Sequence, residues 1–344
     1  MMIQRVVVVL LVITVLVAFA VGELRNRWAA PLMIPEQGFI LRVAQGDSLQ
    51  TAVDSMNAAG ILTCPKLVIL YGRWTGLDQQ IKPGEYFLPI NSTAQSMLMQ
   101  LQSGDVITYQ VTLPEGITLA MAMDILKQEK KLEITLEGPT DSRLLEMMKP
   151  YSSPEGLFFP DTYHYVYGDS DWSILQRAHS AMNAVLKEEW AQRASSLPYE
   201  SPYEAVIMAS IIERETGLPE ERQQISGVFV RRLQRGMLLQ TDPTVIYGLG
   251  VEFDGNLQRE HLSDDNNSYN TYRRTGLPPT PIGLPGRSAI HAALHPDAES
   301  SLYFVARGDG GHVFSNTLTE HNRAVRKYQL QRRKGYTSSP LKSQ

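Results

Sequence analysis

The longest apolar run lies near the start of the chain, where residues 6–22 follow the polar pair Gln4 and Arg5. This run holds no charged residue and is just long enough to cross a bilayer as a helix. It is rich in valine and exceeds a usual signal core, so we expect a cytoplasmic tip and a retained transmembrane anchor over residues 1–28. Ala18 and Ala20 flank Phe19 in a cleavage-site pattern, which leaves a removed signal peptide as the alternative.

Beyond a short stalk at residues 29–37, strand and helix patterns alternate. The segment 39–56 opens with the extended run FILRV, turns at Gly-Asp-Ser, and continues with apolar residues at helical spacing. A second helix is expected over 64–74, then a strand within KPGEYFLP and a capped helix that ends at Gly104. The order of strand, turn and helix returns at 107–126, which indicates a related unit used twice.

The second half of the chain has mainly helical patterns and one long irregular segment. We expect a helix over 218–236, a Pro- and Gly-rich loop over 266–286, a hairpin over 302–315 and a last helix that ends near residue 333. Loops of this length in compact domains usually carry function. Short strands mixed with amphipathic helices predict an α+β fold.

The segment SPYEAVIMASIIERETG predicts a helix that carries a carboxylate on an apolar side. Capping signals mark both of its ends, from Ser201 to Gly217. At about 100° per residue, Glu215 falls near the centre of the apolar side that includes Ile211, whereas Glu213 falls almost opposite.

A carboxyl group on an apolar side has two interpretations. Desolvation raises its pKa, so that it holds a proton near neutral pH as a general acid must. Alternatively, Glu215 bends out to solvent or pairs with an arginine, because charged residues are rarely fully buried. Glu213 is expected to be a surface or salt-bridged residue.

Composition argues against several classes of function. A formal net charge of -4 gives no reason to expect a nucleic acid partner. Cys64 is the only cysteine, which excludes an intrachain disulfide and argues against a cysteine-based zinc site. A Gly-x-Ser-x-Gly motif, typical of serine hydrolases, does not occur in the sequence.

His291 and His295 have a spacing that can bind a metal when both lie on one helix face. The glutamate of the zinc-protease motif is missing between them, and Pro296 follows at once. We therefore expect a structural histidine pair, with no metal and no cofactor.

Two segments that follow the glutamate helix offer polar groups suited to an N-acetylated sugar. LQTDPTVIYG and YNTYRRTGLPP carry amide, hydroxyl and phenol groups, whose dipoles can stabilise an oxocarbenium-like transition state. The candidate substrate-binding residues are Gln240, Asp242, Thr244, Tyr247, Asn270 and Tyr272. Scaffolding of the loop is the alternative for these residues, and Asp242 can also cap a turn before its proline.

Several segments taken together resemble a known family. ASIIERET, GVFVRRLQRGMLLQTDPTVIYG, YNTYRRTGLPPTPIGLPG and HAALHPD with YFVARGDGGHVFS are similar to the endolytic murein transglycosylases of the MltG family, also called YceG-like. The resemblance spans nearly the whole chain. It implies a bacterial inner-membrane protein with a LysM-like domain, here residues 38–108, and a catalytic domain, here 109–333, before a disordered tail at 334–344.

The resemblance also implies a mechanism in which the second glutamate of Glu-x-Glu-Thr, here Glu215, is catalytic. One carboxyl group protonates the oxygen that leaves C1 of N-acetylmuramic acid, then accepts the proton of the C6 hydroxyl as a 1,6-anhydro ring closes. The implied partners are peptidoglycan glycan strands and peptidoglycan synthases in the periplasm. Two alternatives stay open: a muramidase that adds water with Asp242 as second carboxylate, and a non-catalytic glycan-binding division scaffold.

Overall fold

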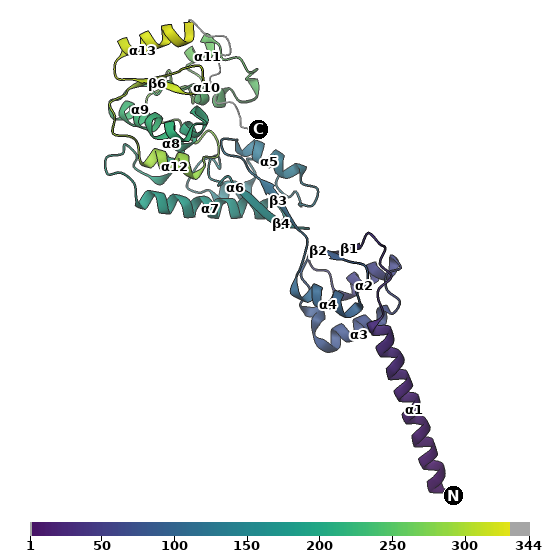
Figure 1. Ribbon diagram of the computed structural model, residues 1–344. Helices are drawn as coiled ribbons and strands as arrows, with labels where there is room; N and C mark the ends of the chain where they lie inside the picture. The colour runs from purple at the N-terminus through teal and green to yellow at the C-terminus, as the bar shows by residue number, and fades with distance from the viewer. Residues whose placement is uncertain (1, 331–344) are drawn as a thin grey trace. The chain divides into compact units, whose positions relative to one another are not determined.

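The computed structural model describes residues 2–330, and the tail expected at 334–344 lies outside them. The chain divides into two compact units, each with its own apolar core (Figure 1). The first unit comprises Met1–Gln110, Lys130–Glu133 and His164–Ser170. The second comprises Val111–Glu129, Ile134–Tyr163 and the chain from Asp171 onwards.

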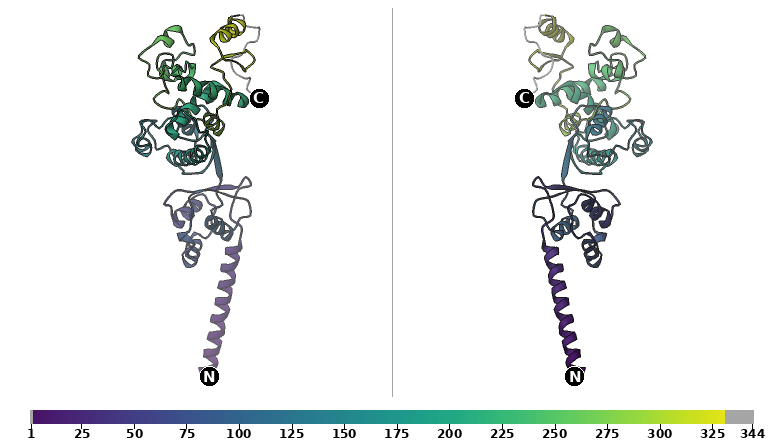
Figure 2. Two further views of the ribbon diagram at one scale, coloured as in Figure 1. Left: turned by 90° about the vertical axis from the view of Figure 1, so that its left-hand side faces the viewer. Right: turned by 90° about the vertical axis from the view of Figure 1, so that its right-hand side faces the viewer.

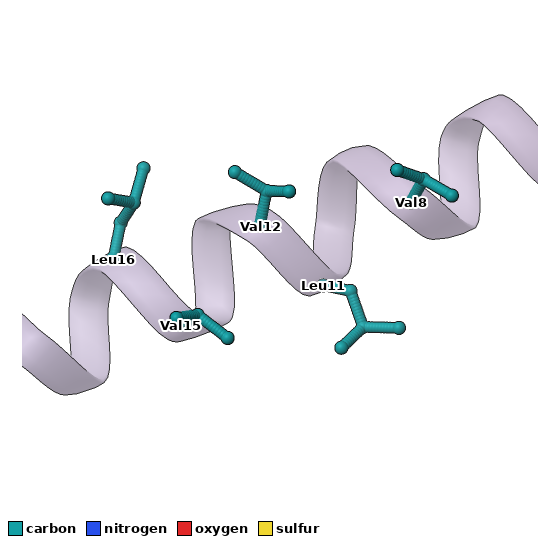
Figure 3. A pocket seen from close by; sticks show the side chains of 5 residues that line it. All are labelled: Val8, Leu11, Val12, Val15 and Leu16. Carbon is teal, nitrogen blue, oxygen red and sulfur yellow. The ribbon is translucent and has the colours of Figure 1, made fainter.

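The first unit begins with α1, a helix over Met2–Ala29 that Figure 2 shows without interruption. Its apolar side chains project outward along the helix, as Val8, Val12 and Leu16 do in Figure 3. These three side chains are more than half exposed.

The expected transmembrane helix is not supported by the structure. α1 forms, but it extends past the apolar run through Glu23 and Arg27, which form an ion pair at 3.0 Å. Within residues 2–330, no helix combines the length and the apolar character needed to cross a membrane. The membrane-spanning part of the predicted fold is therefore wrong, because the helix that carries the uncharged run 6–22 also carries charged residues on both sides of it.

Two strands and three helices form the body of the first unit. β1 (Phe39–Val43) pairs antiparallel with β2 (Gly84–Leu88), and α2 (Leu49–Ala58) and α3 (Pro65–Thr75) lie between them in the sequence. α4 (Ala94–Ser103) follows β2. These elements confirm the local patterns, whereas the LysM-like character of the unit stays a prediction.

A buried carboxylate joins later segments of the chain to the first unit. Glu85 on β2 has no exposed surface, and both Lys131 Nζ and Arg42 Nε lie 2.7 Å from its Oε1. The hydroxyl of Tyr109 also donates to Glu85. Burial raises the pKa of Glu85, but the hydrogen bonds from Lys131, Tyr109 and Arg42 outweigh it and hold the pKa below its usual value. The carboxylate therefore stays ionised and binds Lys131, which follows second-unit residues in sequence, to the first unit.

Mixed elements make up the second unit, as the α+β prediction requires. β3 (Thr108–Thr112) pairs with β4 (Thr162–Val166), and each of these two strands has residues in both units. β5 (Tyr303–Ala306) pairs antiparallel with β6 (His312–Ser315). The helices are α5 (Leu119–Gln128), α6 (Ser142–Met147), α7 (Asp171–Ala191), α8 (Pro202–Glu215), α9 (Arg222–Gln234), α10 (Asp242–Leu249), α11 (Arg259–Ser263), α12 (Arg287–Leu294) and α13 (Leu318–Val325).

α8 is the central helix of the second unit. Its bounds confirm the predicted helix, and Ser201 caps it by accepting the backbone N–H of Glu204 at 3.3 Å. The structure buries every residue from Ala205 to Ile212, because α7, α9, α10 and α12 all pack against this helix. The sequence pattern predicted only one apolar side. Both sides are covered, so an ionisable group reaches polar surroundings only near the end of the helix.

Candidate active site

Glu215 is the last residue of α8 and has intermediate solvent exposure. Its Oε2 accepts a hydrogen bond of 2.7 Å from the Thr241 hydroxyl. Burial is the main cause that raises the pKa of Glu215, and the negative charge of Asp242 raises it further. The carboxyl group thus combines a raised pKa with contact to solvent, which is the combination that a general acid needs.

Three neighbouring groups act in the opposite direction on Glu215. Electrostatic interactions with His312 and Arg232 lower its pKa, as does the hydrogen bond from Thr241. Arg232 is held rigidly, because its Nε donates to the carbonyl of Leu302 at 2.8 Å and its NH1 to that of Leu239 at 2.7 Å. These groups favour the carboxylate once Glu215 has given up its proton.

The segment before α10 brings Thr241 and Asp242 to Glu215. Gln240 is exposed and has a φ of 54°, a conformation that costs a non-glycine residue on the order of 1–3 kcal/mol. The backbone N–H groups of Gln240 and Thr241 donate to Thr271, to its carbonyl and to its hydroxyl, both at 3.1 Å. The loop that holds Thr271 therefore fixes this strained segment beside the acid.

Asp242 is exposed at the first position of α10, where the helix dipole favours a negative charge. The Tyr272 hydroxyl donates to its Oδ1 at 2.6 Å. Burial and the charge of Asp242 raise the pKa of Tyr272, so the phenol keeps its proton. Of the predicted substrate-binding residues, Gln240, Asp242 and Tyr272 are the three that the structure leaves partly or fully exposed near Glu215.

Thr244 and Asn270 lie beneath this surface with no exposed area. The Thr244 hydroxyl donates to the carbonyl of Thr241 at 2.8 Å. The Asn270 amide donates to the carbonyl of Asp264 at 2.8 Å and accepts the backbone N–H of Tyr272 at 3.0 Å. These contacts support the scaffolding alternative for both residues, because they hold the loop that carries Tyr272.

Tyr247 turns toward a carboxyl group that the sequence did not reveal. Its hydroxyl donates to Oε2 of Glu155 at 3.1 Å, and its ring packs edge-on against Tyr269 with the centroids 4.9 Å apart. Burial raises the pKa of Glu155 to about 7. The only local signal at Glu155 is a turn sequence, so its burial was not predictable.

Glu213 is salt-bridged, which confirms the second of its two expected roles. Arg222 NH2 lies 2.9 Å from its Oε1, and the backbone N–H of Gly286 donates to its Oε2 at 3.0 Å. The side chain is only 5% exposed, because α8 is covered on this side as well. Glu213 joins the end of α8 to the start of α9 and of α12.

A second carboxylate and an imidazole meet at the same end of α8. Glu221, in the short helix Pro219–Glu221 that follows α8, accepts His312 Nδ1 at 2.7 Å and the His312 backbone N–H at 2.8 Å. The side chain of Glu221 is 10% exposed and that of His312 is 7% exposed. This pair holds the β5–β6 hairpin beside Glu215. Neither residue was predicted as part of the site, because no local pattern in the sequence links positions 91 residues apart.

His291 and His295 lie with Glu189 in the one group of described residues that brings three possible metal ligands within 4.8 Å. His291 Nδ1 lies 2.9 Å from Glu189 Oε2, and His295 Nε2 lies 2.8 Å from the carbonyl of Gln192. Arg287 also pairs with Glu189, at 3.3 Å. These contacts join α7 to α12, and the structural role of the histidine pair stays a prediction.

The Pro-rich loop lines two hollows, and neither includes Glu215. One has a volume of about 510 Å³ and includes Tyr203 and Ile207 of α8, and the other has a volume of about 300 Å³ and includes Tyr269 and Arg274. Both share Gly276–Pro279. The first hollow lies toward the start of α8, away from the candidate acid at its end.

Comparison with known proteins gives a consistent result. The model of the YceG-like family matches residues 41–327. A protein of Bacillus subtilis (strain 168) named endolytic murein transglycosylase is 30% identical over 311 residues, which cover 84% of each chain. A protein of the same name from Streptococcus pneumoniae (strain D39) is 26% identical, over 82% of this chain and 57% of that protein.

A solved structure is also similar to this chain. The crystal structure of a putative yceG-like protein from Listeria monocytogenes aligns with a TM-score of 0.53 and 26% identity, over 84% of this chain and 99% of that one.

Proposed function

The chain belongs to the YceG-like family, and from this premise we propose that it is an endolytic murein transglycosylase. Its substrate is peptidoglycan, and the bond cleaved is the β-1,4 link between N-acetylmuramic acid and N-acetylglucosamine within a strand. The observation that carries the proposal is Glu215, a carboxyl group with a raised pKa and partial exposure at the end of a buried helix.

In the first step, Glu215 donates its proton to the glycosidic oxygen as the bond from this oxygen to C1 breaks. The raised pKa of Glu215 keeps this proton available. Positive charge then develops at C1, and the new carboxylate of Glu215 receives support from Thr241 and from the charge of Arg232.

In the second step, the C6 hydroxyl of the same sugar closes on C1 and passes its proton to the Glu215 carboxylate. The bond from C1 to O6 replaces the bond that was broken, so a 1,6-anhydro end forms and no water is consumed. Glu215 returns to its protonated form. Gln240 and Tyr272 offer amide and phenol groups to the sugars at the exposed surface beside it.

A hydrolytic muramidase is the second candidate, and one observation favours it. Asp242 is a second carboxylate, close enough for its charge to raise the pKa of Glu215. In that reaction Asp242 would activate a water molecule and the product would carry a reducing end. Its hydrogen bond from Tyr272 and its position at a helix start equally suit a carboxylate that only tunes the acid.

The place of action follows from the substrate. Murein lies outside the cytoplasmic membrane, so the second unit must act on the outer side of that membrane. In a bacterium with an outer membrane, this compartment is the periplasm. The resemblance of the sequence further suggests that the enzyme ends newly made strands beside peptidoglycan synthases. Co-purification of a synthase with the protein tests this last part.

Analysis of reaction ends decides between the candidates. Purified protein is incubated with glycan strands, and the fragments are resolved by mass spectrometry. Anhydro ends, lighter than reducing ends by one water, are expected from the wild type and absent with Glu215→Gln. Reducing ends would instead establish the muramidase. Strand binding without any new ends would point to a glycan-binding scaffold.

A further inference from the structure

Glu155 is a buried carboxyl group that the proposed mechanism does not use. It lies between Pro154 and Gly156, with 6% of its surface exposed. Its Oε1 accepts the backbone N–H of Leu119, the first residue of α5, at 2.9 Å. Its Oε2 accepts the Tyr247 hydroxyl of α10 at 3.1 Å. Glu155 therefore bridges two helices from a segment that belongs to neither.

The helix at the far end of this bridge carries part of the candidate site. α10 begins at Asp242, and Thr241 directly before it donates to Glu215. Tyr247 lies on the same short helix, and its ring also contacts Tyr269 of the loop that holds Tyr272. The position of Tyr247 thus fixes where the start of α10 lies relative to Glu215.

We propose that Glu155 is a positioning residue for the Glu215 site: its ionised carboxylate holds Tyr247 and so keeps Thr241 and Asp242 against Glu215. The inference rests on the proposed transglycosylase function and adds to it a group that never touches the glycan.

The groups around Glu155 explain why it changes charge near neutral pH. Burial is the main cause that raises its pKa, to about 7, while the contacts from Leu119 and Tyr247 and the charge of Arg214 on α8 lower it. Tyr203, also on α8, faces it as a neutral phenol, with a pKa raised to about 12 by burial and by nearby groups. A protonated carboxyl group has fewer acceptor sites, so its hold on Tyr247 weakens below this pKa.

A purely structural role does not account for a carboxylate at this position. A glutamine has the same shape, keeps an oxygen for the Leu119 N–H, and avoids the penalty of burying a charge. A carboxyl group that ionises near pH 7 differs from a glutamine because it binds the Tyr247 hydroxyl through a charge-assisted hydrogen bond when ionised and more weakly when protonated.

The test measures kcat/KM for glycan cleavage between pH about 5 and about 8. It compares Glu155→Gln and Tyr247→Phe with the wild type. At the alkaline end each variant is expected to lose about 10-fold or more, since a hydrogen bond to a charged group is removed. At the acid end the three proteins are expected to converge. The double variant is expected to be no worse than the single ones, because both changes remove the same contact.

Two matched variants control for loss of a buried group elsewhere in the unit. Glu189→Gln neutralises a carboxylate paired with Arg287 and His291, and Tyr199→Phe removes a buried hydroxyl that has no hydrogen-bond partner. Neither should change the pH profile. Amide hydrogen exchange over residues 240–247 should quicken in Glu155→Gln and stay at the wild-type rate in Glu189→Gln.

The outcomes separate the two proposals. If the wild type cleaves strands and Glu155→Gln keeps both its pH profile and its exchange rates, the positioning role is overturned. If the wild type cleaves nothing, the proposed function fails, whereas hydrogen exchange still tests whether Glu155 holds α10. If Glu155→Gln does not fold, Tyr247→Phe tests the same contact with the carboxylate intact.

Discussion

The hydroxyl of Thr241 donates a 2.7 Å hydrogen bond to Oε2 of Glu215, although 26 positions separate the two residues in the sequence. The contact joins the end of the central helix α8 to the start of α10. It lowers the pKa of Glu215 while burial raises it, so the acid can both release and recover a proton. Oε2 accepts from Thr241, so Oε1, which has no hydrogen-bond partner among residues 2–330, is the oxygen that we expect to carry the transferable proton.

Replacing the acid is expected to abolish cleavage. Glu215→Gln keeps the shape and the hydrogen bond from Thr241 but removes the transferable proton. General acid-base groups contribute about 10²- to 10⁴-fold, and one group serves both steps here, so the loss should reach the upper end or exceed it. Fragment release from glycan strands measures the effect, with circular dichroism as the check on folding. Substantial residual cleavage by a folded variant would exclude Glu215 as the acid.

The hydrogen bond from Thr241 is expected to matter for rate. Thr241→Val keeps the volume of this buried side chain and removes the donor, while Thr241→Ser keeps the donor. A hydrogen bond to a charged group contributes about 1.5–3 kcal/mol, so kcat should fall roughly 10- to 100-fold in the valine variant only. Equal rates for the serine and valine variants would show that the hydroxyl has no part in catalysis.

Glu213 is expected to control stability and to leave the chemistry intact. Glu213→Ala leaves the buried Arg222 guanidinium with only its longer contact to Glu115, at 3.8 Å, so the loss of unfolding free energy should lie toward the lower end of the about 3–5 kcal/mol typical of a broken buried pair. Glu213→Gln keeps the acceptor for the Gly286 N–H and should cost less. Denaturant unfolding measures both, and cleavage per folded molecule should stay within a few-fold of the wild type. A folded, stable Glu213→Gln protein without activity would contradict this division of roles.

Stability of the protein should fall as pH rises toward neutrality. Burial raises the pKa of Glu155 from 4.5 to about 7, so the folded protein holds this proton more tightly than the unfolded chain does. The raised pKa adds roughly 3 kcal/mol to the free energy of unfolding below pH about 4.5. This contribution is lost as pH rises through about 7. Glu155→Gln should flatten this part of the curve, and Glu215, whose pKa is also raised, acts in the same direction. Unfolding at a series of pH values gives the slope, and an unchanged slope in Glu155→Gln would show that Glu155 titrates normally.

The first unit should depend on Lys131 although this residue follows α5 in the sequence. Lys131→Met removes a partner that lies 2.7 Å from the fully buried Glu85 and leaves Arg42 and Tyr109. We expect a loss of about 2–4 kcal/mol, less than for a completely unpaired buried charge, and partial rescue in Glu85→Gln/Lys131→Met. A fragment of residues 38–108 lacks Lys131 and Tyr109, so it should be less stable than the unit within the full chain. Thermal unfolding of the variants measures this effect, and an unaffected Lys131→Met protein would contradict it.

Local signals in the sequence determined the helices, the turns and the candidate acid. Helix caps and apolar spacing depend only on residues close together in the sequence. The sequence therefore predicted the bounds of α8 and the position of Glu215 in its last turn. The family was also identifiable from ordered motifs, and the match over residues 41–327 confirms it. The same local reasoning failed for α1, where the apolar run predicted a membrane span that the structure does not support.

Tertiary structure alone decided what surrounds each ionisable group. Glu155 meets Tyr247 across 92 positions, and Glu221 meets His312 across 91. No local pattern encodes such pairs, because burial and charge partners arise only when distant segments pack together. The same packing covered both sides of α8 and placed Glu213 in a buried ion pair. A sequence can name a carboxylate, but its pKa depends on neighbours that the folded chain supplies.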